Sequence, residues 1–299
     1  MTGRRGPSLA AVVAGVLLAA ACSVGAAVDP APPPLDATRA GYVVVEADLH
    51  VHTRFSDGFL SPLDVVVHAR RQGLGAIALT EHNVIFPARM ARGWSRLVGG
   101  PEVIVGEEIT TRDYHLLAFG LERAVDAHQP LTRAIEDVHA QGGVVVAAHP
   151  ARRYWPALEP AMALLDGAEV VHPVTFRQRG SGWAAEDFHA FWDRMRAQRP
   201  RAVAIGTSDY HAGPILGLGT TLVFARSRSA ADLVEALRDG RTVVAGPDGT
   251  LHGDPALVAA VEEEPLPARR VAACLAVLAL VALRRERTRS GSTPPPAVA

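Results

Sequence analysis

Short apolar runs alternate with helical patterns between residues 43 and 245 of the chain. The apolar runs predict strands over 43–52, 76–80, 103–109, 114–119, 144–148, 168–171, 202–205 and 243–245. Helices are predicted over 130–141 and 229–239, and another begins at a Ser61 cap and stops at Gly73. Repeated β–α units of this kind predict an α/β fold with a parallel sheet, open or closed into a barrel.

Histidine and carboxylate residues follow these predicted strands at the point where each strand ends. His50 and His52 end the first strand, and residues two apart on a strand share a face, so both imidazoles point the same way. Asp57 lies on the loop after the same strand, and His115 opens the strand that follows Glu108. The other strand ends carry Glu81, His82, Glu107, Glu108, His149, Asp209 and His211. Because the carboxyl ends of parallel strands converge on one crevice, the pattern predicts a metal site there.

The composition narrows the chemistry further. The formal net charge of the 299 residues is −1, so no strongly basic surface for nucleic acid is expected. All 30 basic residues are arginine, which excludes Schiff-base, P-loop and carbamylated lysine chemistry. Cys22 and Cys274 lie in terminal segments, so the central domain has no cysteine for a disulfide or a zinc site. The 12 histidines are an unusually large supply of the commonest metal ligand.

The two ends of the chain differ from the middle. A basic start, an apolar run and small residues make 1–27 a predicted signal peptide or membrane anchor, with Cys22 as a candidate lipidation site. The remaining predicted segments are a Pro-rich linker 28–40, the domain 41–250, a linker 251–270, a transmembrane helix 271–283 and a basic, Pro-rich tail 284–299. An amphipathic or domain-packed helix is the alternative for 271–283. We therefore expect an exported protein, anchored through its termini, with the domain outside the cytoplasm.

The strand-end residues belong to motifs that resemble those of the PHP family, named for polymerase and histidinol phosphatase. The motifs are Asp48-Leu49-His50-Val51-His52-Thr53 with Ser56-Asp57-Gly58, Thr80-Glu81-His82-Asn83, Gly106-Glu107-Glu108-Ile109, His149-Pro150 and Thr207-Ser208-Asp209-Tyr210-His211. The resemblance covers about residues 47–220, in the family's order. It implies a distorted seven-stranded β/α barrel with up to three metal ions at its C-terminal rim, and metal-dependent phosphoesterase activity.

The resemblance also implies three groups of metal ligands. One ion would be bound by His50, His52, Glu107 and Asp209. A second would be bound by Asp57, His82 and His211, and a third by His115 and His149, with Glu107 bridging it to the first. The mixed nitrogen and oxygen ligands leave Zn, Mn and Fe open as the metal.

Glu81 and Glu108 alternate with these ligands along their strands. They are therefore expected to face the other way, in hydrogen bonds or structural ion pairs.

Such a centre implies hydrolysis of a phosphate ester by a metal-bridged hydroxide, because two metal ions ~3.5–4 Å apart lower the pKa of a shared water. Asp209 and His211 are candidates to serve the leaving group. Arg152 is the candidate phosphate clamp, since its planar fork matches phosphate oxygens. The other arginines near the motifs are Arg54, Arg153, Arg177 and Arg179, and His172 is a further residue at a strand end.

Two alternatives stay open. One is an amidohydrolase-like hydrolase of a non-phosphate bond, although the absence of lysine removes the usual carbamylated bridge. The other is a non-catalytic, metal-dependent binding or sensing module at the membrane, against which the intact ligand set argues. The expected partners are a small-molecule phosphoester and the membrane, with no nucleic acid, whereas the sequence leaves the substrate, the metal and the oligomeric state undetermined.

Overall fold

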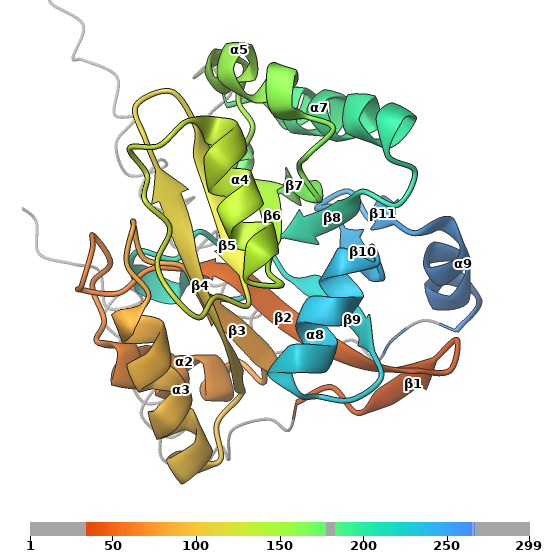
Figure 1. The fold of residues 1–299 in the computed structure, drawn as a ribbon. Coiled ribbons are helices and arrows are strands. Elements are labelled where there is room, and N and C mark those ends of the chain that lie inside the picture. Colours follow the sequence, from red (N-terminus) through yellow and green to blue (C-terminus); the bar gives the residue numbers. More distant parts are fainter. Residues whose placement is uncertain (1–33, 178–182, 265, 267–299) are drawn as a thin grey trace, which may run out of the picture. The chain divides into compact units, whose positions relative to one another are not determined.

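A sheet of eleven strands runs through the computed structural model, which describes residues 34–177, 183–264 and 266 (Figure 1). The strands are β1 (Ala37–Arg39), β2 (Tyr42–Val51), β3 (Ala76–Leu79), β4 (Glu102–Thr110), β5 (His115–Phe119), β6 (Val144–Ala147), β7 (Gly167–Val171), β8 (Val203–Gly206), β9 (Thr221–Ala225), β10 (Thr242–Ala245) and β11 (Leu251–Gly253). Their order is β11-β10-β9-β2-β3-β4-β5-β6-β7-β8, with β1 paired to β2. Every strand predicted from an apolar run is present, whereas β1, β9 and β11 were not predicted.

Two parallel blocks, β2-β3-β4 and β6-β7-β8, make up much of the sheet. β5 joins these blocks and is antiparallel to both β4 and β6. β9 is likewise antiparallel to β2. The expectation of a parallel sheet is therefore wrong at these places. Only residues 111–114 separate β4 from β5, and a connection this short can join only antiparallel strands.

The two ends of the strand order approach each other, so the sheet is nearly closed into a barrel. Thr242 Oγ1 in β10 donates to Ala204 O in β8 at 2.7 Å, and Gly206 N donates to Thr221 Oγ1 in β9 at 2.9 Å. These bonds link β8 to β9 and β10 across the remaining gap. The α/β barrel-like fold is confirmed, but the described part of the chain has eleven strands in its sheet rather than seven.

Helices cover the sheet from outside and close one end of the barrel (Figure 1). They are α2 (Pro62–Arg71), α3 (Phe86–Val98), α4 (Leu131–Ala140), α5 (Trp155–Leu158), α6 (Val174–Arg177), α7 (Ala185–Gln198), α8 (Ala230–Arg238) and α9 (Pro255–Glu263), with short 3-10 turns at Arg152–Tyr154, Glu159–Ala161 and Gly213–Ile215. Ser61 caps α2 as predicted, because its Oγ accepts a hydrogen bond from Asp64 N at 3.2 Å.

Both faces of the strands are buried. In β3, Ile77 and Leu79 pack in a core shared with α2 and α3, whereas Ala76 and Ala78 pack in a second core shared with α8. Burial on both faces explains why the strands are continuous apolar runs. Polar side chains can therefore meet water only at the strand ends, where the predicted site residues lie.

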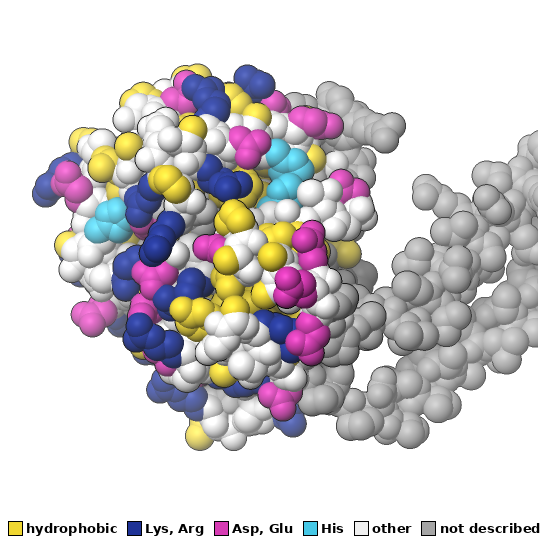
Figure 2. Space-filling model, turned by 90° about the vertical axis from the view of Figure 1, so that its right-hand side faces the viewer, with side chains coloured by type: hydrophobic (Ala, Val, Ile, Leu, Met, Phe, Trp, Pro, Cys, Tyr) yellow, Lys and Arg dark blue, Asp and Glu magenta, His cyan; other side chains and the backbone are white. Residues whose placement is uncertain are grey.

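The folded unit is wider than the predicted domain 41–250. It spans Ala31–Glu264, because β1 pairs with β2 at one end, and β11 and α9 extend it at the other. Part of each predicted linker thus belongs to the domain. The predicted anchor 1–27 and helix 271–283 lie outside the described residues, and no described helix is long and apolar enough to cross a membrane. On the face in Figure 2, acidic and basic side chains are interspersed with hydrophobic ones.

Candidate metal centre

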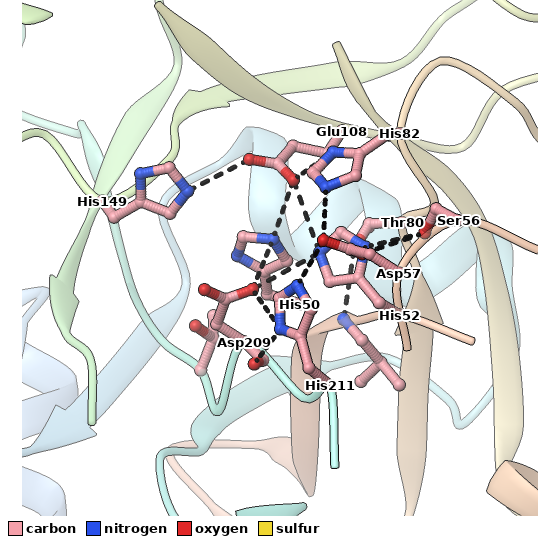
Figure 3. Close-up of polar contacts among 12 residues, drawn as sticks. His50, His52, Ser56, Asp57, Thr80, His82, Glu108, His149, Asp209 and His211 are labelled. Atoms are coloured by element: carbon pink, nitrogen blue, oxygen red, sulfur yellow. Dashed lines mark hydrogen bonds and ion pairs between the residues drawn. The ribbon is translucent and has the colours of Figure 1, made fainter. Parts of the chain in front are cut away.

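The segment after β8 lies beside the end of β2 and brings two pairs of predicted ligands together. Tyr210 N donates to His50 O at 3.1 Å, and His52 N donates to Tyr210 O at 2.9 Å. These backbone bonds place Asp209 and His211 next to His50 and His52 (Figure 3). Asp209 and His149 both have positive φ angles, of 47° and 27°, a strained conformation that is common at functional sites.

Two imidazole nitrogens and two carboxylate oxygens from three parts of the chain approach one another in this cluster. His50 Nε2 lies 3.2 Å from Asp209 Oδ1 and 3.4 Å from Glu108 Oε2. His52 Nε2 lies 3.3 Å and 3.4 Å from the same two oxygens. Ligands at the usual ~2.0–2.2 Å from a tetrahedral metal ion are themselves about 3.3–3.5 Å apart. Each imidazole nitrogen is therefore spaced from both carboxylate oxygens as two ligands of one metal ion are, and His50, His52 and Glu108 together form a group that could hold an ion.

The hydrogen bonds of the histidines fit the same assignment. His50 Nε2 and His52 Nε2 are buried and have no hydrogen-bond partner in the described part of the chain. His50 Nδ1 is 3.0 Å from the carboxylate oxygen Glu169 Oε1, so it carries the ring proton and leaves the Nε2 lone pair free. Buried nitrogens without a partner are costly, and a bound metal ion removes that cost.

A second group lies on the open side of the cluster. Asp57 Oδ2 is 3.1 Å from His211 Nε2 and 3.4 Å from His82 Nε2, and the Asp57 side chain is 52% exposed. His211 Nδ1 lies 2.9 Å from the carbonyl oxygen of Asp209 and must donate to it, which leaves the Nε2 lone pair facing Asp57. The structure thus brings together the predicted second ligand set.

The third predicted pair, His115 and His149, meets the other oxygen of Glu108. Glu108 Oε1 lies 2.6 Å from His115 Nδ1 and 3.0 Å from His149 Nε2. Glu108 is only 1% exposed, and its two oxygens face two different groups of ligands. It is therefore placed to bridge two metal ions.

The bridging role expected for Glu107 is wrong, because Glu107 points to the other side of the sheet. Its Oε1 accepts a hydrogen bond from Val125 N at 2.8 Å, and among the described residues it makes no hydrogen bond or ion pair with the histidine cluster. Burial raises the pKa of Glu107 to about 7. Adjacent residues of a strand face opposite ways, so when Glu108 faces the cluster Glu107 cannot.

Glu81 does face away from the metal ligands, as expected. Its carboxylate accepts hydrogen bonds from Thr53 N at 3.0 Å and from Ser56 Oγ at 2.5 Å. It therefore holds the loop that carries Asp57.

No role was assigned from the sequence to two buried residues of the cluster, Glu169 and His172. Glu169 is fully buried and lies close to His50 Nδ1, Thr207 Oγ1 and the backbone nitrogen of His149. The sequence feature that could have pointed to Glu169 is its position as a single carboxylate inside the apolar strand 167–171. His172 Nδ1 accepts a hydrogen bond from Val174 N at 3.1 Å, so its proton is on Nε2, which lies 3.2 Å from Asp209 Oδ2. His172 therefore lies beside Asp209 at the edge of the cluster, and its Nε2 has no hydrogen-bond partner in the described part of the chain.

The predicted phosphate clamp Arg152 is engaged elsewhere. Its Nε donates to Asp187 Oδ1 of α7 at 2.7 Å, and its guanidinium lies 4.1 Å above the Trp155 ring. The neighbouring Arg153 instead lies between two aromatic rings, 4.6 Å from Tyr154 and 4.3 Å from Trp183. Both rings are near His149, at centroid distances of 6.0 Å and 5.5 Å. Arg153 is therefore the arginine that the fold holds at the edge of the cluster.

The electrostatics of the cluster keep its carboxylates ionised. Burial opposes ionisation of Glu108, but His50 and hydrogen bonds from His115 and His149 hold its pKa well below the usual range. Burial also opposes ionisation of Asp209, and His50 and His172 again hold its pKa well below normal. The pKa of Glu169 is lowered to about 2, because His50 outweighs its burial. Ionised carboxylates are the form that binds metal ions.

Comparison with known proteins agrees with this geometry. Residues 48–148 match the family model of the PHP domain. An uncharacterized protein of Methanocaldococcus jannaschii is 28% identical over 139 residues, which make up 42% of this chain and 81% of that protein. A 5′-3′ exoribonuclease of Haemophilus influenzae is 33% identical over 97 residues, or 31% of this chain and 34% of the enzyme.

A solved structure shares the fold. It is a two-domain protein of Bacteroides vulgatus that contains a predicted PHP-like metal-dependent phosphoesterase. Its TM-score is 0.63 at 24% identity, and the match covers 82% of this chain and 76% of that one.

Proposed function

Because residues 48–148 match the family model of the PHP domain, we propose that the protein is a metal-dependent phosphoesterase that hydrolyses a phosphate ester at a multinuclear centre. The observation that carries the proposal is that two imidazole nitrogens without a hydrogen-bond partner in the described part of the chain each lie 3.2–3.4 Å from the same two carboxylate oxygens. The Bacteroides vulgatus protein, which shares the fold and contains a predicted PHP-like metal-dependent phosphoesterase, supports the same reaction class.

Divalent ions bound here would lower the pKa of a water and neutralise charge on the phosphate oxygens. Glu108 would hold two neighbouring ions, one on each oxygen. We propose about two to three ions per chain, of Zn, Mn or Fe, because the three ligand groups exceed what one ion of four to six ligands can use. Elemental analysis of protein purified without chelator tests this, and one ion or none would contradict it.

Asp209 and His211 were also expected to serve the leaving group. Both turn their donor atoms into the ligand groups, and neither has a second atom free to carry a proton to the ester. We therefore propose that they act by binding and orienting metal ions. Arg153, held beside His149, is the residue we propose to donate to the phosphate oxygens.

The experiment that tests the function is a screen of phosphomonoesters and phosphodiesters with the full-length chain, with Mn, Zn and Fe supplied separately. Turnover that needs one of these metals, and that is lost in His50→Ala, is expected. A chain that binds the metals but cleaves no phosphate ester with any of them would contradict the proposal.

We further propose that the enzyme is exported and membrane-tethered, acting on a small-molecule phosphoester outside the cytoplasm. The support is the basic start and apolar run within 1–27 and the arginine-flanked run 271–283. When fused after residue 264, a reporter enzyme that works only after export should be active, and a reporter that works only in the cytoplasm should be inactive. A cytoplasmic reporter that works at this point would contradict the topology.

A further inference from the structure

Three phenylalanines are exposed on the loops that carry the second ligand group. Phe55 is 50% exposed, Phe59 is 73% exposed and Phe86 is 58% exposed. Large apolar side chains gathered on the surface mark a binding site more often than chance exposure does. We call these three residues the phenylalanine rim.

The loop of Phe55 and Phe59 is held in place, so their exposure is a fixed feature of the fold. Thr53 O accepts hydrogen bonds from Ser56 N at 3.1 Å and Gly58 N at 2.9 Å, and Arg54 N donates to Leu60 O at 2.8 Å. Gly58 packs so closely on His52 that a Cβ there would lie 2.5 Å from the His52 carbonyl. The loop therefore cannot fold inward to bury its phenylalanines without breaking these contacts.

The phenylalanine rim is next to the metal ligands. Phe55 and Phe59 each stand two residues from Asp57, a chain distance of at most about 7 Å. Phe59 N also donates to His211 O at 2.7 Å. Phe86 follows His82 by four residues, and its ring contacts Phe55 edge to face at 6.2 Å. The rim thus follows the open side of the cluster, where Asp57 is half exposed.

We propose that the phenylalanine rim is a subsite for the alcohol part of the substrate, and that this part is an apolar aryl or alkyl group. The inference rests on the proposed function, since a phosphate bound beside Asp57, His82 and His211 places the ester's carbon atoms on the open side. An aryl or alkyl group buries more apolar surface against phenyl rings than a small polyol such as glycerol does. Arg153 lies near His115 and His149, at another part of the cluster, and does not oppose this orientation.

The test compares benzyl phosphate with glycerol phosphate as substrates of the full-length, metal-loaded chain. Phe59→Ala should raise KM for benzyl phosphate roughly tenfold, with kcat and the constants for glycerol phosphate unchanged. Phe59→Leu, which stays apolar, should keep most of the wild-type affinity. The matched control is Leu97→Ala, because Leu97 is 81% exposed at the far end of α3, the helix that begins at Phe86.

Binding of phosphonates separates this proposal from the proposed function. Calorimetry should show benzylphosphonate binding more tightly than methylphosphonate to the wild type, with the preference lost in Phe59→Ala. Equal binding of the two phosphonates, or a KM increase of the same size for glycerol phosphate, would overturn the subsite. Preferred binding of benzylphosphonate without turnover of either ester would leave the subsite standing and contradict the phosphoesterase.

Discussion

Glu107 and Glu108 are neighbours in β4, but their carboxylates lie on opposite sides of the sheet. Glu108 contacts five histidines of the cluster, whereas Glu107 accepts a hydrogen bond from Val125 N. The two residues have the same chemistry and are both buried, so they form a matched pair for testing which one holds metal ions.

Glu108→Gln should remove at least one metal ion per chain. The amide has no charge to offset two cations, and it turns one oxygen into a donor that faces the ligand nitrogens. Glu107→Gln should keep the wild-type metal content, since its hydrogen bond needs only a carbonyl oxygen. Elemental analysis after equilibrium dialysis measures both. Equal losses in the two variants would mean that the assignment of Glu108 is mistaken.

The place of the metal centre could be predicted from the sequence, but the choice between these glutamates could not. Histidines and carboxylates after apolar strands are a local pattern, and the edge at which they meet follows from the strand direction. Which glutamate faces the cluster depends on the register of β3 against β4, where Leu79 pairs with Val105 and His82 with Glu108. No local pattern sets the register of two parallel strands, so His82 and Glu108 could not be matched in advance.

Long-range contacts explain the other differences. Arg152 follows His149 closely in sequence, but its direction is set by Asp187 in α7, 35 residues away. The short strands β1 and β11 pair with strands that are part of the sheet, β1 with the start of β2 and β11 with β10 at the sheet edge. Propensity within such three-residue segments is too weak to predict them.

Glu169→Gln should weaken metal binding roughly 10–100-fold, the usual cost of losing a carboxylate that orients a metal-bound histidine. Glu169 fixes the proton on His50 Nδ1, and an amide fixes it less firmly. Asp166→Asn is the control, because Asp166 is a buried carboxylate just before β7 that bonds His139 and Arg199 instead. Competition with a metal-binding dye measures both affinities. If Asp166→Asn weakened metal binding to a similar extent, the effect of Glu169→Gln would be explained by general destabilisation of the fold.

Acid should destabilise the fold partly through His252. Its ring lies 4.5 Å from that of His189, and burial together with His189 lowers its pKa. The unfolded chain therefore binds more protons than the folded chain as the pH falls below about 6.5, and stability contributed by this group is lost toward the lower, folded-state pKa.

Urea unfolding at about pH 7.5 and about pH 5.5, with saturating metal, tests this. The loss of unfolding free energy on acidification should be smaller for His252→Gln than for the wild type. His128→Gln should behave like the wild type, because the His128 side chain is 95% exposed. If His252→Gln lost as much unfolding free energy on acidification as the wild type, the pair of His252 and His189 would not contribute to the pH dependence of stability.

Arg153→Ala should lower kcat/KM roughly 30–150-fold, which corresponds to about 2–3 kcal/mol of contact with phosphate in the transition state. Tyr154 and Trp183 hold the guanidinium beside His149, so its free N–H groups are oriented before substrate binds. Arg153→Lys should recover only part of the rate, since an ammonium group lacks the planar fork. Arg152→Ala should stay within about twofold of the wild type, because Arg152 is held by Asp187 and Trp155. Steady-state kinetics at unchanged metal content decides between the two arginines, and a larger loss in Arg152→Ala than in Arg153→Ala would reverse their roles.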